Sequence, residues 1–138
     1  MAAVELKSLL VAPFVGRLAK TFAPYGLRFG NFLRVNAAVE TRIYTSKQML
    51  QRILEDLIHA AFARSPESAE LTISSESAAL EFRISDSGPS VALEQRAQLI
   101  TDDLAFTKRA VEALGGTLWM ESNAPRGAVV CFVLPMGN

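Results

Sequence analysis

An aspartate and a glycine that directly follow a strand-like run are the residues of this chain best suited to bind a ligand. Leu80, Phe82 and Ile84 alternate with polar residues, as in a half-buried strand, and the run leads into Asp86 and Gly88. A carboxylate there can accept a hydrogen bond from an amino group, and a glycine lets the backbone lie against a flat ligand. Because Asp and Gly are also common where a strand ends in a turn, the motif alone does not separate a binding site from a turn.

The other side chains that could react or titrate lie in patterns that indicate structural roles. His59 follows Glu55 by four residues on a predicted helix, which predicts an ordinary surface pair. Cys131 is the single cysteine and lies in an apolar run, so we expect a buried thiol and no internal disulfide. Asp102 and Asp103 precede another predicted helix and are expected to cap its N-terminus.

The composition is that of an ordinary globular domain. Half of the 138 residues are hydrophobic, and 14 Lys and Arg balance 14 Asp and Glu, so no net charge favours nucleic acid or an anionic membrane. The longest apolar run, over 9–15, is too short to span a membrane, and the N-terminus does not resemble a signal peptide. We therefore expect one cytoplasmic domain over residues 1–138 that contacts neither nucleic acid nor membrane.

Hydrophobic periodicity predicts an α+β fold, a two-layer sandwich with a mixed β-sheet and helices packed on one face. Pro13 should kink or divide the first helix, which is expected to end at Pro24 to Gly26. Thr45 and Gln48 predict a capping box at the start of the second helix. The predicted helices span 4–22, 46–63 and 104–114, with a shorter helical stretch over 92–100, and the predicted strands span 27–35, 41–45, 70–74, 80–85, 117–122 and 128–134.

The last third of the chain has the most specific pattern. It reads Ala110-Val-Glu-Ala-Leu-Gly-Gly-Thr-Leu-Trp-Met-Glu-Ser-Asn, then a Gly turn and a last strand that ends in Leu134-Pro135. This pattern resembles the catalytic, ATP-binding domain of sensor histidine kinases, and the resemblance covers essentially the whole chain. The domain belongs to the GHKL (HATPase, Bergerat-type) superfamily, which also contains DNA gyrase and MutL. The resemblance implies ATP and Mg²⁺ as cofactors.

The motifs of that family are partly changed here. The resemblance implies that Asp86 accepts a hydrogen bond from the adenine amino group and that Gly88 lets backbone pass close to the base. The family's Asn-Leu-Leu-x-Asn-Ala run is Asp56-Leu-Ile-His-Ala60-Ala in this chain. Ala60 therefore stands at the position of the Asn that holds Mg²⁺ in the family. Its methyl group cannot be a ligand for a cation that binds oxygen. Asp56, one turn earlier, could substitute in part or be a surface carboxylate with a local partner.

The family's glycine-rich phosphate loop is also replaced. At its position the chain has Asp102 and Asp103 before Leu104, so two carboxylates stand where a triphosphate would lie and would repel it. The segment before Leu104 is shorter than the family's mobile ATP lid, and the pocket Thr is Ala128. The positions of the nucleotide site are thus Asp86, Gly88, Asp56, Ala60 and Asp103. We expect no catalytic residue and no complete metal site.

Three functions fit the sequence. The favoured one is a degenerate ATPase-like domain of a two-component sensor histidine kinase, inactive by itself, that binds ATP weakly or not at all. It would act by contact with a dimerisation and phosphoacceptor domain or with a response regulator. The second is the catalytic domain of an active histidine kinase that phosphorylates a His on a separate dimerisation domain. The third is a stand-alone binding protein akin to anti-sigma-factor kinases or histidine phosphotransferases. The starting point of the chain suggests a fragment of a longer sensor.

Overall fold

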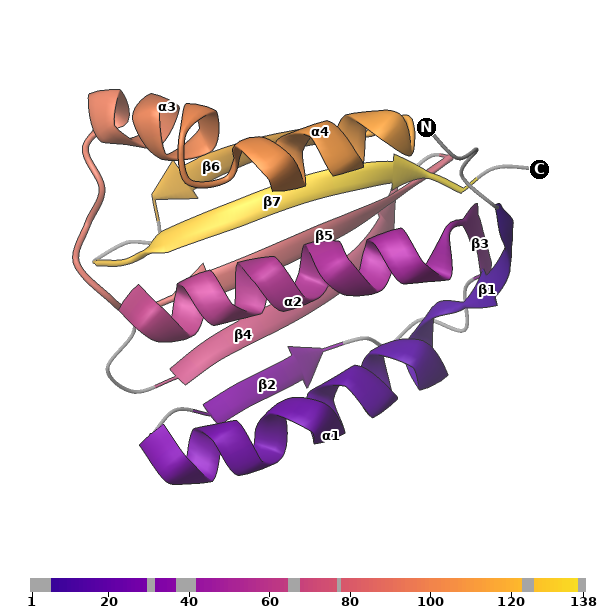
Figure 1. Cartoon of the computed structure of the whole chain (residues 1–138), viewed down its shortest axis with the longest axis horizontal. Helices are drawn as coiled ribbons and strands as arrows, with labels where there is room; N and C mark the ends of the chain where they lie inside the picture. The colour runs from indigo at the N-terminus through magenta and orange to yellow at the C-terminus, as the bar shows by residue number, and fades with distance from the viewer. Residues whose placement is uncertain are drawn as a thin grey trace.

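A mixed sheet runs through the molecule (Figure 1). The computed structural model describes residues 6–29, 32–36, 42–64, 68–76, 78–122 and 126–136. Within these residues the main sheet has five strands in the order β2-β4-β5-β7-β6. β2 pairs with β4 in parallel and the other neighbours are antiparallel. The strands are β2 (Phe32–Asn36), β4 (Ser68–Glu76), β5 (Ala79–Asp86), β6 (Thr117–Ser122) and β7 (Ala128–Pro135).

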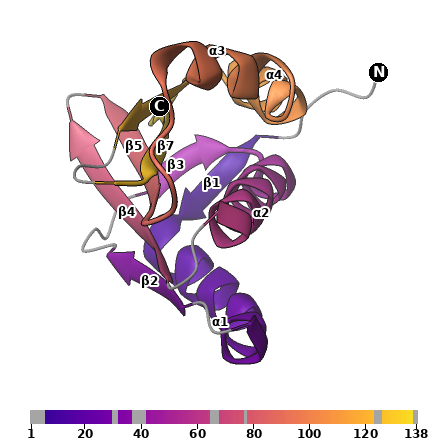
Figure 2. The same cartoon turned by 90° about the vertical axis from the view of Figure 1, so that its left-hand side faces the viewer.

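The helices lie on one face of the main sheet, as Figure 2 shows in a view from the side. This arrangement confirms the predicted α+β fold with a mixed sheet and helices on one face. The second helix, the β4–β5 hairpin and the last two strands form where the hydrophobic pattern predicted them. The helices are α1 (Val11–Phe29), α2 (Lys47–Arg64), α3 (Leu93–Thr101) and α4 (Ala105–Ala113).

A second, two-stranded sheet pairs β1 (Lys7–Leu10) with β3 (Arg42–Thr45) in antiparallel orientation. It is joined to the end of β7, because the Tyr44 backbone N–H donates to the Met136 carbonyl at 3.0 Å. The Met136 N–H in turn donates to the Ala78 carbonyl at 2.9 Å, in the turn between β4 and β5. The small sheet is therefore anchored to the large one through backbone hydrogen bonds.

The core lies between the helices and the inner face of the sheet. Leu80, Phe82 and Ile84 of β5 are buried on this face, as their alternation predicted, and the Phe82 ring stacks on Phe132 of β7 with centroids 4.5 Å apart. Burial of such side chains is the main favourable term for folding. Among the described residues, no helix is both long and apolar enough to cross a membrane. The buried face of α2 consists of Leu50, Ile53, Leu54, Leu57, Ile58, Ala61 and Phe62.

The first predicted helix is wrong at both ends. Residues 7–10 form strand β1, and α1 begins only at Val11 and continues to Phe29, beyond the predicted stop at Pro24. Pro13 does not divide the helix because it lies in the first turn, where a backbone N–H has no intrahelical partner to lose. The predicted strand over 27–35 shrinks to β2, and Gly30 within it lies outside the described residues.

Two predicted helix caps are also wrong. The Ser46 hydroxyl, not that of Thr45, accepts the N–H of Met49 at 3.3 Å at the start of α2. The Thr45 hydroxyl is buried, and no hydrogen-bond partner for it lies among the described residues. At the start of α4 the N-cap residue is Leu104, which makes no side-chain cap hydrogen bond. Asp102 instead ends α3, because a tight turn joins α3 and α4.

Candidate functional site

Asp86 is a buried carboxylate at the end of β5. Its side chain is only 4% exposed, because its strand position faces the helices, as do Phe82 and Ile84 before it. Oδ1 accepts the backbone N–H of Gly88 at 2.9 Å and that of Ala128, the first residue of β7, at 3.3 Å. The sequence placed Asp86 at the end of a strand, and the structure adds that two strands meet at this carboxylate.

The other carboxylate oxygen of Asp86 pairs with Arg64, the last residue of α2. Arg64 Nε lies 3.1 Å from Oδ2, and Nη2 donates to the Pro89 carbonyl at 2.6 Å. One guanidinium therefore connects the end of α2 to the end of β5 and to the segment after it. Sequence reasoning missed Arg64, because a basic residue in the last turn of a helix is common for its favourable interaction with the helix dipole. No sequence signal indicates a partner 22 positions away.

Two glycines allow the backbone to pack tightly around Asp86. A Cβ atom at Gly88 would overlap the Arg64 carbonyl oxygen, so the end of α2 can approach this turn only in the absence of a side chain. Gly127 has φ +104°, and a Cβ there would overlap the Asp86 carbonyl oxygen. Gly88 was predicted to lie against a ligand, whereas in this structure its open side faces the backbone of Arg64.

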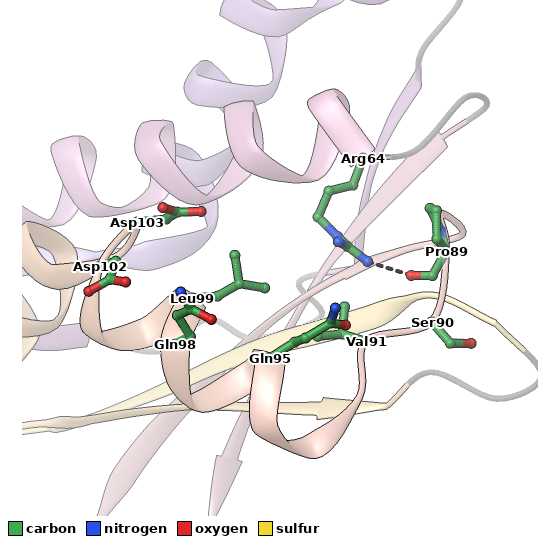
Figure 3. A pocket seen from close by; sticks show the side chains of 9 residues that line it. All are labelled: Arg64, Pro89, Ser90, Val91, Gln95, Gln98, Leu99, Asp102 and Asp103. Atoms are coloured by element: carbon green, nitrogen blue, oxygen red, sulfur yellow. Dashed lines mark hydrogen bonds between the residues drawn. The ribbon is translucent and has the colours of Figure 1, made fainter.

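Two cavities adjoin this cluster. The first, of about 280 Å³, lies between α2, the sheet and the turn that joins α3 to α4, and its wall is mostly apolar. The second, of about 500 Å³, lies beside α3 and is shown in Figure 3, with Arg64 and Pro89 at one end and Asp102 and Asp103 at the other. Residues that line the first cavity include Leu57, Ala60, Arg64, Asp86, Leu99, Asp103, Met120 and Val130.

The predicted site residues are only partly brought together. Asp86, Ala60 and Asp103 line the first cavity, and the backbone of Gly88 packs beside it. Asp56 is not among the lining residues, and its carboxylate pairs with Arg52 one turn earlier on α2, with Nε and Oδ1 3.3 Å apart. This is the local pairing that the sequence offered as the alternative to a metal ligand. No group of three or more His, Cys, Asp or Glu side chains that could hold a metal occurs among the described residues.

A separate polar network lies on the face of the sheet opposite the helices, at the strand positions that alternate with the core. Arg83 Nη2 donates to Glu121 at 2.9 Å, and the Trp119 indole N–H donates to the same carboxylate at 2.7 Å. Both hydrogen bonds lower the pKa of Glu121, that from Arg83 more. Cys131, registered between Arg83 and Trp119, is buried, and this burial raises its thiol pKa to about 12. The thiol is accordingly neutral and unreactive at neutral pH.

Comparison with known families identifies the chain. Residues 45–138 match the family model for the histidine kinase-, DNA gyrase B-, and HSP90-like ATPases. The match covers more than half of the chain and includes α2, the cluster around Asp86, the turn between α3 and α4 and the last two strands. The chain therefore belongs to this family of ATPases. No curated protein sequence matches it significantly.

Solved structures of histidine kinases share the fold. Full-length ShkA in complex with AMPPNP is 21% identical with a TM-score of 0.89, and the match covers 99% of this chain and 32% of that one. The catalytic domain of ThkA is 16% identical with a TM-score of 0.88, covering 96% of this chain and 98% of that one. AdeS of Acinetobacter baumannii is 20% identical with a TM-score of 0.85, covering 99% and 70%. The fold is thus that of a histidine kinase ATPase domain, and this chain spans about a third of full-length ShkA.

Proposed function

We propose that residues 1–138 form a single ATPase-like domain of a two-component sensor histidine kinase that binds ATP weakly or not at all. In this proposal its Mg²⁺ and phosphate sites are degenerate and it acts by protein contact in signal transduction, in the cytoplasm. Family membership supports the domain type, and Ala60 and Asp103 at the wall of the first cavity support the degeneracy.

One observation carries the proposal. The first cavity is lined by Ala60 of α2 and by Asp103 of the turn between α3 and α4, the two positions at which the resemblance implies a Mg²⁺ ligand and a phosphate-binding loop. A methyl group donates no electron pair to Mg²⁺, and a carboxylate repels phosphate oxygens unless a cation lies between them. The carboxylate of Asp56 is already paired with Arg52 and does not line the cavity.

The partner we propose is the dimerisation and phosphoacceptor domain of the same sensor or a response regulator. ThkA, which shares the fold at 16% identity and a TM-score of 0.86, has been solved in complex with the response regulator protein TrrA. That complex supports a two-component partner of this kind. The formal net charge of zero supports neither nucleic acid nor an anionic membrane as the binding surface.

Isothermal titration with ATP and Mg²⁺ tests the proposal. We expect no saturable heat for the wild-type protein, and micromolar binding would contradict the proposal. Ala60→Asn restores an amide oxygen at the cavity wall and should increase Mg²⁺-dependent ATP affinity. His59→Asn adds the same amide at the adjacent, exposed position of α2 and serves as the matched control.

The second candidate is the catalytic domain of an active histidine kinase that phosphorylates a His on a separate dimerisation domain. The buried Asp86 at the wall of an apolar cavity of about 280 Å³ favours it, because such a carboxylate can recognise an amino group away from water. In that case the wild-type protein binds Mg²⁺-ATP, and Asp86→Asn abolishes the binding. Unchanged affinity in Asp86→Asn would exclude this candidate.

A further inference from the structure

Arg64 contacts both features that were predicted to recognise a base. Its guanidinium pairs with Oδ2 of Asp86 at 3.1 Å, while its own carbonyl oxygen lies where a side chain of Gly88 would be. Its third contact, Nη2 to the Pro89 carbonyl at 2.6 Å, holds the guanidinium from the far side. The side chain is 27% exposed and lines both cavities, so it forms part of the wall that a ligand would meet.

We propose that Arg64 is an internal ligand of the base site, which occupies Asp86 and Gly88 and so excludes an aminopurine such as adenine. This inference rests on the proposed function, because it concerns the same site. It adds a second obstacle to ATP binding, a block at the residues that would contact the base (the base end, Asp86 and Gly88). This block is independent of the residues that would contact Mg²⁺ and the phosphates (the phosphate end, Ala60 and Asp103). It predicts that repair of Ala60 and Asp103 alone does not produce adenine recognition.

The relative strength of the competing hydrogen bonds supports the block. An exocyclic amino group offers Asp86 a neutral donor, whereas Arg64 offers a hydrogen bond together with the attraction of a full positive charge at a site only 4% exposed. The remaining oxygen, Oδ1, already accepts the N–H groups of Gly88 and Ala128. A base that displaced Arg64 would also have to break its bond to Pro89 and leave a guanidinium partly buried without its carboxylate.

Adenosine is the probe that isolates this end of the site, because it carries no phosphate. We would titrate it into ¹⁵N-labelled wild-type protein and follow the backbone amides of Gly88 and Ala128 together with the Nε–H of Arg64. The expected result is no saturable shift at millimolar adenosine. Saturable, simultaneous shifts of all three signals in the wild-type protein would show that the base displaces Arg64, and would overturn the inference.

Arg64→Leu keeps an apolar side chain but removes the guanidinium. It should bind adenosine saturably, with a dissociation constant at least about tenfold below the limit set by the wild-type titration, the factor that a hydrogen bond to a charged group contributes. Arg52→Leu removes an arginine from the same helix that pairs with Asp56, and should leave adenosine binding unchanged. A folded Arg64→Leu protein with wild-type affinity for adenosine would overturn the inference. Should that variant not fold, the titration of the wild-type protein still decides.

The two proposals fail in different experiments. If the wild-type protein binds Mg²⁺-ATP but not adenosine, the proposed degeneracy of the phosphate end is wrong and the block by Arg64 stands. If it binds neither, and folded Arg64→Leu binds no adenosine, the block is wrong and the degeneracy stands.

Discussion

Helix α2 carries two arginine–carboxylate pairs of the same chemistry in different surroundings. Arg52 and Asp56 lie one turn apart with 63% and 33% of their side chains exposed, and Nε and Oδ1 are 3.3 Å apart. Arg64 and Asp86 join the end of the helix to the end of β5, are 27% and 4% exposed, and lie 3.1 Å apart. The N–O distances of the two pairs hardly differ. The difference in their contribution to stability therefore comes from their burial and from the number of elements that each pair joins.

The comparison shows which carboxylate is structural. Asp56 can lose its partner to water at little cost, because both side chains remain solvated. Asp86 cannot, because three donors from α2, the turn at Gly88 and β7 converge on it away from water. A residue predicted for ligand binding thus also holds the end of α2, the turn at Gly88 and the start of β7 together.

The largest effect is expected for Asp86→Ala. The substitution leaves Arg64 and the N–H groups of Gly88 and Ala128 without their acceptor, which should lower the free energy of unfolding by about 3 kcal/mol. Urea denaturation followed by circular dichroism measures the change. A loss well below 1 kcal/mol would mean that the cluster around Asp86 is solvated in solution and would remove the contrast between the two pairs.

Gly88→Ala tests the close approach of α2 to the same turn. The added methyl group would overlap the Arg64 carbonyl oxygen, so we expect a loss of roughly 1–3 kcal/mol from the displaced backbone. Gly16→Ala is the matched control, because it lies in α1 with no atom within 4 Å of the new Cβ. That change should stabilise the protein by about 0.5–1 kcal/mol, the preference of a helix for Ala over Gly. Equal effects of the two substitutions would contradict the packing described here.

A third pair, Arg83 with Glu121 on the outer face of the sheet, should produce a pH dependence. Hydrogen bonds from Arg83 and Trp119 hold the pKa of Glu121 below its ordinary 4.5 in the folded protein. Their stabilisation is therefore present above pH 4.5 and is lost as the pH falls through the lower, folded pKa.

Arg83→Gln removes the larger cause of this shift, so its unfolding midpoint should depend less on pH than that of the wild-type protein between about pH 6 and pH 3. The measurement is a series of urea titrations across that range. Parallel curves for the two proteins would show that Glu121 does not contribute. Because 43% of the Glu121 side chain is exposed, we expect the effect to be smaller than that of Gly88→Ala.

The smallest effect is expected for Asp56→Ala. An exposed pair one turn apart contributes about 0.3–0.5 kcal/mol, and Arg52 retains its position over the Phe106 ring, 4.9 Å from the centroid. Urea denaturation in low and high salt measures it, since salt screens such a pair. A loss comparable to that of Asp86→Ala would show that exposure does not separate the two pairs.

The sequence predicted much of the sheet because its signals are local. Leu80, Phe82 and Ile84 alternate on one buried face, and paired glycines at 115 and 116 end the last helix before β6. The position of Asp86 followed from the same strand. The short strand β1 was predicted as helix, because four residues do not distinguish alternation from the helical periodicity of α1 behind them.

The part of the site that the sequence did not predict depends on a contact between residues far apart in the chain. From the sequence, Arg64 is only a basic residue at the end of a helix. Its guanidinium contacts Asp86 because α2 packs against β5 in the folded protein. Asp102 and Asp103 satisfied the sequence rule for an N-cap, but the tight turn between α3 and α4 gives that position to Leu104. The first outcome depends on a partner far along the chain, and the second depends on where the preceding helix α3 ends.

The position of Cys131 gives the protein a built-in reporter of opening. The thiol is fully covered in the folded sheet, and its pKa of about 12 keeps it in the unreactive form at neutral pH. A thiol-specific reagent can therefore label it only while the groups that cover it on the outer face of the sheet move away. The labelling rate of the untreated, unmutated protein then measures how often this part of the outer face becomes accessible, and a protein bound over that face would slow it.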